Sequence, residues 1–201
     1  MSKQALRSDL QLVADLIPAG TRVLDLGCGS GELLSYLLNN KHCTGTGVER
    51  DNEEVLNAIR RAVPVVALDL DEQLDQFASD SYDIVVLSRT LQAVLHPTKV
   101  LREMSRIAPR LVVTMPNFGY WQNRVTLLRG HMPRSRDLPF AWYDTPNLHH
   151  STLIDLEKFF AKEHLDISKR ILLTESSEKL AVGRFVPNLF AGSAIYVLGR
   201  R

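Results

Sequence analysis

Apolar positions along the first 115 residues alternate between helical and extended spacing. Apolar residues that recur every three or four positions predict helices, and short apolar runs bounded by glycine, proline or charge predict strands. The predicted helices cover residues 6–17, 33–38, 52–62 and 97–107. The predicted strands between them cover residues 21–26, 44–48, 63–70, 82–88 and 110–115. Strands that alternate with helices favour a parallel, doubly wound sheet.

The last third of the chain has a different pattern. Residues 117–150 are rich in aromatic residues, arginine and proline, and they show no clean period of either kind. A helix capped by Ser151 or Thr152 should follow, and two further strands are predicted at 167–174 and 193–200, joined by a long loop. We therefore expect one domain over residues 1–201 with an insertion at about 117–150, and long loops inside compact domains are usually functional.

Composition limits the possible classes of protein. The chain has 201 residues, is 45% hydrophobic and carries a net charge of +1, so it can bury one sizeable core but has no overall field for nucleic acid or anionic lipid. Its apolar runs are too short to cross a membrane and its polar start lacks a signal-peptide core, so we expect a cytoplasmic protein. Cys28 and Cys43 have neither metal-site spacing nor a ligand cluster, which favours free thiols and no metal.

The sequence VLDLGCGSGELL, residues 23–34, carries the clearest chemical signal. Gly27, Gly29 and Gly31 fall between a buried strand and a helix, where missing side chains allow a sharp turn and close approach of a ligand. Glu49 ends the second strand, eighteen residues after Gly31, where a carboxylate can accept both hydroxyls of a ribose. The glycines could also simply pack a tight turn around no ligand.

A dinucleotide site would share these features, but two details argue against it. The dinucleotide fingerprint is GxGxxG, and here the third glycine comes one residue early. Asp25 directly before the loop would repel a pyrophosphate. Its carboxylate suits a ligand with a cationic amino-acid end instead.

The stretch DLGCGSGEL together with Glu49 resembles motifs I and II of the class I S-adenosylmethionine-dependent methyltransferases. This resemblance implies a Rossmann-like α/β fold with a seven-stranded, mostly parallel sheet, helices on both faces and an antiparallel C-terminal strand. It also implies S-adenosylmethionine or S-adenosylhomocysteine as cofactor. The cofactor-binding residues that it implies are Asp25, Gly27, Cys28, Gly29 and Gly31 at the methionine part, Glu49 and Arg50 at the ribose, Asp69 and Leu70 at the adenine, and Ser88 at the pocket floor.

Cofactor binding does not establish methyl transfer. The work of such an enzyme is to align an acceptor with the methyl group, and a general base helps only when the acceptor must lose a proton. SRTL, residues 88–91, stands where an NPPY-like tetrad would be, which disfavours methylation of adenine, cytosine or glutamine nitrogen. The catalytic base stays unknown, because spacing singles out none of the candidates His96, His131, His149 and His150.

The insertion combines arginines with aromatic residues. The arginines are Arg124, Arg129, Arg134 and Arg136, and the aromatic residues are Phe118, Tyr120, Trp121, Phe140, Trp142 and Tyr143. Such a mixture could form a protein interface, a lid over a small substrate or a satellite core that covers the sheet edge. It could also stack on single-stranded nucleic acid, but the near-neutral net charge argues against that partner.

A narrower resemblance covers residues 22–157. The sequences MPNFGYWQNRVTLLRGHMP, LPFAWYDTPNLHHSTLIDLE, LDLDEQL and LSRTLQAVLHP are similar to the MetW family of methionine-biosynthesis proteins. This resemblance implies a methyltransferase-like protein that works alongside a homoserine O-acyltransferase of the MetX type. From the charge and the short apolar runs we expect neither a nucleic acid nor a membrane as partner. From residue 162 onward the prediction rests on pattern alone.

Two functions remain open at this point. In the first, the chain binds S-adenosylmethionine and supports the acyltransferase as a noncatalytic or regulatory partner through its aromatic insertion. In the second, it is a methyltransferase for a small-molecule acceptor, with the insertion as a lid. The pathway that the resemblance implies favours the first.

Overall fold

The structure, a computed structural model, describes residues 6–134, 142–144, 148–180 and 186–201. It is built on one seven-stranded sheet with strand order β3-β2-β1-β4-β5-β7-β6. The strands are β1 (Arg22–Leu26), β2 (Thr44–Glu49), β3 (Val65–Ala67), β4 (Ile84–Ser88), β5 (Arg110–Pro116), β6 (Leu165–Leu173) and β7 (Ser193–Arg200). β7 runs antiparallel to β5 and β6, and the other neighbouring pairs are parallel. The predicted sheet is thereby confirmed.

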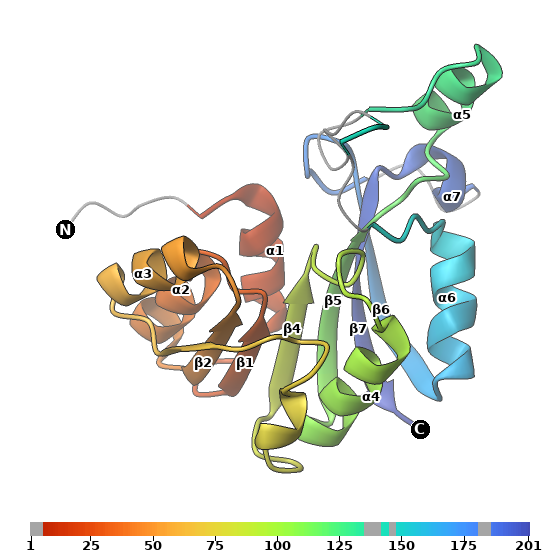
Figure 1. Ribbon diagram of the computed structural model, residues 1–201. Coiled ribbons are helices and arrows are strands. Elements are labelled where there is room, and N and C mark those ends of the chain that lie inside the picture. Colours follow the sequence, from red (N-terminus) through yellow and green to blue (C-terminus); the bar gives the residue numbers. More distant parts are fainter. Residues whose placement is uncertain (1–5, 135–141, 145–147, 181–185) are drawn as a thin grey trace.

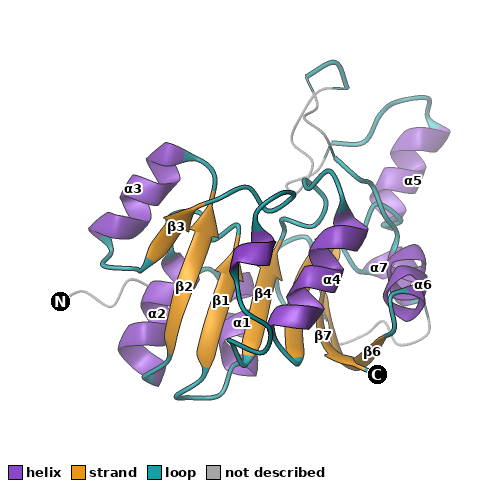
Figure 2. Ribbon diagram, turned by 60° about the horizontal axis from the view of Figure 1, so that its bottom comes forward, coloured by secondary structure: helices purple, strands orange, loops and turns teal. Residues whose placement is uncertain are grey.

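Helices cover both faces of the sheet (Figures 1 and 2). They are α1 (Ser8–Leu16), α2 (Glu32–Lys41), α3 (Asn52–Arg60), α4 (Pro97–Ile107), α5 (Trp121–Leu128), α6 (Leu153–Lys162) and α7 (Pro187–Phe190), with a short 3-10 helix, η1, at Leu74–Gln76. Apolar residues of α1, α2 and α3 pack on one face, and those of α4 and α6 pack on the other. Burying an apolar layer on each face is what fully apolar strands such as β4 require.

Side chains of a strand alternate between these two layers. In β1, Leu24 and Leu26 belong to the α4 and α6 side, whereas Val23 belongs to the α1 and α2 side. Asp25 therefore lies on the side of α1 and α2, near the carboxyl end of β1. Because β1 neighbours both β2 and β4, this end of β1 is the point where the strand order reverses, and such a switch point is the usual ligand site of open α/β sheets.

Two differences from the sequence-based prediction bear on the candidate site and its surroundings. The third strand covers only Val65–Ala67 rather than residues 63–70, so Asp69 and Leu70 lie in the turn after it. The insertion contains the helix α5, which its apolar spacing did not indicate. Both differences concern segments at the carboxyl edge of the sheet.

The base of α5 is fixed by buried amides. The Nδ2 group of Asn117 donates to the carbonyl oxygens of Asn188, at 3.0 Å, and Ala191, at 2.8 Å, while its Oδ1 accepts from Gly119 N–H. Asn188 Oδ1 in turn accepts from the N–H of Leu153 at the start of α6. These bonds satisfy buried polar groups and hold together the segments that lead into α5, α6 and α7.

Candidate functional site

The glycine loop between β1 and α2 contains three left-handed residues. Gly27, Gly29 and Gly31 have φ angles of 68°, 52° and 75°, where a side chain is disfavoured. A Cβ on Gly27 would lie 2.5 Å from Oγ1 of Thr90, which follows β4. Apart from its chain neighbours, no atom lies within 4 Å of a Cβ position on Gly29. The loop is therefore packed tightly at Gly27 and has open space beside Gly29.

Glu49, at the end of β2, holds this loop in place. Its Oε2 accepts the N–H of Gly29 at 2.9 Å, and its Oε1 accepts the N–H groups of Arg50 at 2.8 Å and Asp51 at 3.0 Å. The glycine loop and the acidic residue thus meet in space. A carboxylate offers about four acceptor positions, so these three bonds leave Glu49 capacity for a ligand hydroxyl.

The first of two hollows beside the loop, which we name the Asp25 hollow, has a volume of about 270 Å³. It is lined by Asp25, Gly27, Cys28, Gly29 and Ser88, all predicted from the sequence, and also by residues that the sequence did not indicate, among them Arg7, Leu10 and Glu54. It lies at the switch point of the sheet, between the tips of β1 and β4.

Asp25 is the main charged group inside this hollow. Asp25 is only 3% exposed. Its carboxylate makes no hydrogen bond with the residues that the structure describes. Burial, and after it the negative charge of Glu49, raises the pKa of Asp25 to about 7. The hydroxyl of Ser88 is also buried without a hydrogen-bond partner. The hollow thus presents two polar groups that a ligand could satisfy.

The second hollow, which we name the Glu49 hollow, has a volume of about 180 Å³. Its lining includes the predicted residues Gly27, Glu49, Arg50, Asp69 and Leu70, together with Val48, Asp71, Thr90, Ala93 and Val94. Gly27 lines both hollows, so the two adjoin at the residue where a side chain is excluded. Gly31 lines neither hollow, and begins α2 with its bare Cα against Val63 and Ala58.

Asp71 joins the two loops that flank the Glu49 hollow. It is buried, and its carboxylate accepts the N–H groups of Leu95, at 2.9 Å, and His96, at 2.8 Å. Because these N–H groups belong to the segment between β4 and α4, Asp71 ties that segment to the turn after β3. Its sequence neighbour Asp69 pairs with the exposed Arg50 at 3.3 Å.

The N-terminal end of α1 is anchored beside the Asp25 hollow by a buried ion pair. Asp9 of α1 is buried, and its Oδ2 lies 3.2 Å from Nε of Arg89, the residue after β4. Arg89 has a left-handed backbone, with φ of 58°, and also donates to Oγ of Ser177, in the segment after β6. This pair keeps Arg7 and Leu10 in the wall of the hollow, and sequence reasoning missed it because its members are 80 residues apart.

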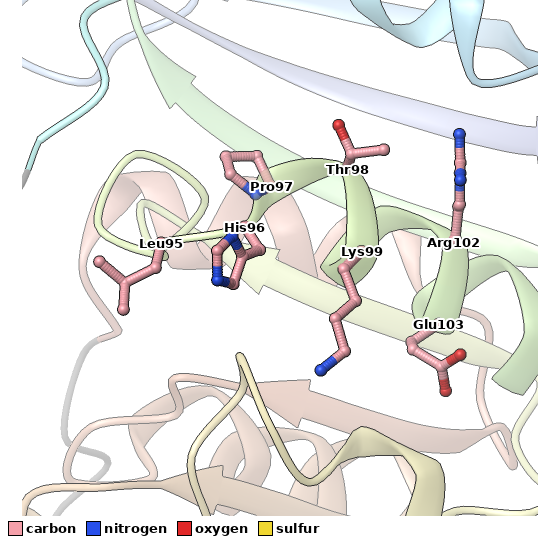
Figure 3. A pocket seen from close by; sticks show the side chains of 7 residues that line it. All are labelled: Leu95, His96, Pro97, Thr98, Lys99, Arg102 and Glu103. Carbon is pink, nitrogen blue, oxygen red and sulfur yellow. The ribbon is translucent and has the colours of Figure 1, made fainter.

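A larger hollow of about 520 Å³ lies along the start of α4, away from the glycine loop, and is lined only by residues 95–103 (Figure 3). Its charged groups already have partners: Lys99 bonds the carbonyl oxygen of Asp71, Arg102 pairs with Glu163, and Glu103 pairs with Arg106. A surface hollow formed by one segment, with its charges satisfied, offers little to a ligand, so we place the candidate site at the two smaller hollows.

The candidate histidines lie apart from both smaller hollows. His96 lines the hollow along α4, and His131 is exposed after α5. The ring of His150 stacks on Phe118 with centroids 4.7 Å apart, and the N–H of His149 donates to the carbonyl oxygen of Gln92. None of these four lines the Asp25 or the Glu49 hollow.

The insertion is described only in part, since Arg136 and Phe140 lie outside the described residues. Trp142 and Tyr143 contact each other edge to face and are each 74% exposed. Such exposure argues against a satellite core at these two residues.

Comparison with known proteins identifies the family. The family model described as "Methionine biosynthesis protein MetW" matches residues 7–198. The chain belongs to the MetW family. A relative from Rhodopirellula baltica, the bifunctional methionine biosynthesis protein MetXA/MetW, is 31% identical over 205 residues, which is 97% of this chain but 33% of the relative. This MetW chain therefore spans about one third of that relative's length.

Solved structures identify the fold. A complex between the Haloferax volcanii Trm112 methyltransferase activator and a putative methyltransferase matches with a TM-score of 0.70 and 17% identity, over 96% of this chain and 88% of that chain. A Thermotoga maritima S-adenosylmethionine-dependent methyltransferase, described as a possible histamine N-methyltransferase, matches with a TM-score of 0.69 and 18% identity over the same shares. At these identities the likeness shows a class I methyltransferase fold, as predicted.

Neither a membrane-spanning helix nor a metal-ligand cluster is present in the described ranges. Within them, no helix combines the length and the apolar character that a membrane crossing needs. The same residues contain no group of three or more histidine, cysteine or acidic side chains that could hold a metal ion. Cys28 and Cys43 are both free thiols.

Proposed function

We propose that this MetW chain binds S-adenosylmethionine in the two adjoining hollows and supports a homoserine O-acyltransferase of the MetX type in methionine biosynthesis. The observation that carries the proposal is the meeting of the Asp25 and Glu49 hollows at Gly27. One end offers a buried, unpartnered carboxylate, and the other offers a second carboxylate with spare acceptor capacity. A ligand with a cationic amino-acid end and a ribose fits both ends.

The methionine part would occupy the Asp25 hollow. Its ammonium group would lie by the Asp25 carboxylate, directly or through water, and supply the positive charge that this buried acid lacks. Ser88 would gain a hydrogen-bond partner at the floor. The open space beside Gly29 allows the ligand to approach the bare backbone of the loop.

The adenosine part would occupy the Glu49 hollow. Glu49 lines this hollow, and its remaining acceptor positions would bind ribose hydroxyls, while Asp69 and Leu70 would flank the adenine. Because Glu49 also binds the N–H of Gly29, ribose binding and the shape of the glycine loop depend on one side chain. When bound, S-adenosylmethionine supplies a reactive sulfonium methyl group, and the residues described here bind and orient it.

Support for the partner comes from the relative in which MetXA and MetW are joined under one name. Two proteins that are joined in one polypeptide work side by side. We infer that separate chains of the same two kinds bind each other. We propose that the acyltransferase binds this chain with an affinity that depends on cofactor occupancy. Such a dependence must be reciprocal, so the acyltransferase would change the affinity for the cofactor by the same factor.

Titration calorimetry with S-adenosylmethionine tests the cofactor site. Replacing Glu49 by Gln keeps one oxygen for the N–H groups of Arg50 and Asp51. It removes the negative charge offered to the ribose and the acceptor that binds the N–H of Gly29. We expect a loss of about 1.5 to 3 kcal/mol, or roughly 10- to 100-fold in affinity. Glu53→Gln, an exposed change in the first turn of α3, is the matched control and should leave the affinity unchanged. An unchanged dissociation constant in Glu49→Gln would refute the assignment.

Assays of acyltransferase activity with and without this chain, at zero and saturating cofactor, test the supporting role. We expect a change in activity that depends on both additions. If purified chain instead transfers label from S-adenosylmethionine to a defined metabolite and leaves the acyltransferase unaffected, the protein is a small-molecule methyltransferase and the supporting role is wrong.

A further inference from the structure

Helix α5 presents an apolar face to solvent. Trp121, Val125 and Leu128 recur at positions i, i+4 and i+7 and therefore form one stripe along the helix. Leu128 is 87% exposed and Trp121 is 41% exposed, whereas Val125 between them is half-buried and Asn123, on the opposite side, is buried. A helix at a protein surface normally turns its apolar stripe inward. Here both ends of the stripe are exposed to solvent.

This face is held in a fixed position. Arg124 Nε donates to the carbonyl oxygen of Gly119 at 2.7 Å, and Asn123 Nδ2 donates to that of Phe118 at 3.2 Å. These bonds attach the first turns of α5 to the segment that Asn117 anchors. Figure 1 shows α5 standing out beyond the carboxyl ends of β4 and β5, across the molecule from α2 and α3. A rigid, protruding face is preorganised for a partner, which lowers the cost of binding.

The charge around the stripe has one sign. Residues 117–134 contain Arg124, Arg129 and Arg134 but no aspartate or glutamate. Leu56 and Ile59 of α3 are also exposed, yet there Glu53, Glu54, Arg60 and Arg61 mix both signs, as on an ordinary solvated helix. The surface that complements α5 is an apolar groove edged with carboxylates.

We propose that the Trp121–Val125–Leu128 face of α5 is the surface by which this chain docks into such a groove on its acyltransferase partner. The proposal rests on the partner named under the proposed function. It assigns the contact to a helix-in-groove mode, in which the apolar anchors supply affinity and the arginines steer encounter. The cofactor hollows take no part in this contact, so docking leaves them accessible from the edge of the sheet.

Binding of purified acyltransferase, measured by calorimetry, tests the surface with three variants. Leu128→Ser removes the most exposed anchor and should weaken the complex at least tenfold. Arg129→Glu should weaken the complex several-fold and reduce the dependence of its affinity on salt. Leu56→Ser, at a residue that is 53% exposed on α3, is the matched control and should bind like the unaltered chain. All three should bind S-adenosylmethionine with unchanged affinity.

The other outcomes overturn the proposal in distinguishable ways. If the unaltered chain binds the acyltransferase and Leu128→Ser binds it equally well, the surface is wrong and the proposed partnership stands. If the unaltered chain fails to bind at any cofactor concentration, the partnership fails and the surface with it. If Leu128→Ser unfolds, or abolishes self-association of the isolated chain without affecting acyltransferase binding, the face is covered by this chain itself or by a second copy.

Discussion

The edge of the sheet that carries the Asp25 and Glu49 hollows differs from helix α5 in the kind of group that it buries. Around the glycine loop, polar groups are buried and the backbone is bare: within the described part of the chain neither the Asp25 carboxylate nor the Ser88 hydroxyl has a hydrogen-bond partner, and Gly27 has no room for a side chain. On α5 apolar groups are exposed, and the charged residues of the sequence 117–134 are all arginines. Small charged ligands are held by a few buried polar groups, whereas protein partners are held by exposed apolar anchors. The difference indicates one site for a small molecule and another for a macromolecule.

The largest expected effect concerns Asp25, the buried acid in the Asp25 hollow. Because the pKa of Asp25 is raised from 3.8 to about 7, the folded protein binds a proton that the unfolded chain releases above its own lower pKa. The free energy of unfolding should therefore fall as pH rises from about 4 to about 7, by at most roughly 4 kcal/mol at 1.4 kcal/mol per pKa unit. Above pH 7 this contribution is fully lost.

Denaturant unfolding of the ligand-free protein between pH 4.5 and 8 measures this effect. Asp25→Asn should flatten the profile and raise stability at pH 8, and Asp15→Asn, an exposed change on α1, should leave the profile as it is. Parallel profiles for the unaltered chain and Asp25→Asn would mean that Asp25 is well solvated, and would remove the contrast with α5.

A second change tests the bare backbone. Gly27→Ala places a Cβ against Thr90 in a left-handed conformation and should lower the free energy of unfolding by about 2 to 4 kcal/mol, from backbone strain plus overpacking. It should also weaken cofactor binding. Gly20→Ala has a similar φ of 74° and open space around it, so only about 1 to 2 kcal/mol of strain is expected. Equal losses in thermal unfolding of the two variants would show that the contact with Thr90 is unimportant.

The smallest expected effect tests whether the pair of Asp9 and Arg89 supports the Asp25 hollow alone. Asp9→Asn weakens the pair with Arg89, which links α1 to the segment after β6 through Ser177. We expect about 1 to 2 kcal/mol of lost stability, below the cost of removing a fully buried partner, because the side chain of Arg89 is 22% exposed and water can solvate its charge.

Cofactor affinity in Asp9→Asn should fall several-fold in calorimetry, since Arg7 and Leu10 line the Asp25 hollow. Acyltransferase binding without cofactor should stay unchanged. If it falls as well, the pair of Asp9 and Arg89 also supports the acyltransferase contact, and its assignment to the Asp25 hollow alone is wrong.

The sheet and most of the residues that line the two hollows could be predicted from the sequence, because both depend on local signals. Apolar runs such as Ile84–Leu87 identify buried strands, and residues at the ends of parallel strands meet at one edge, as Asp25 and Glu49 do. The close packing of Gly31 against Val63 was not predicted, because spacing cannot tell a glycine that faces a hollow from one that packs a helix against its neighbours. The end of β3 was misplaced because Leu68 and Leu70 continue an apolar pattern after the chain has left the sheet.

Other features depend on contacts that spacing does not encode. Helix α5 was missed because it is short and has only three apolar positions at helical spacing, Trp121, Val125 and Leu128, while Leu127 lies off that stripe. Asp71 gave no signal because its partners are the backbone N–H groups of Leu95 and His96. The pair of Asp9 and Arg89 joins elements that only the folded sheet brings together.

The shortness of α5 has a consequence for how long a complex could last. A helix of eight residues is about 12 Å long, so a contact limited to its face covers less than the roughly 1,200 to 2,000 Å² of a stable interface. A complex of separate chains should then form and dissociate rapidly and fall apart on dilution. A tether between the two proteins would offset this, because it fixes a high effective concentration without any new contact.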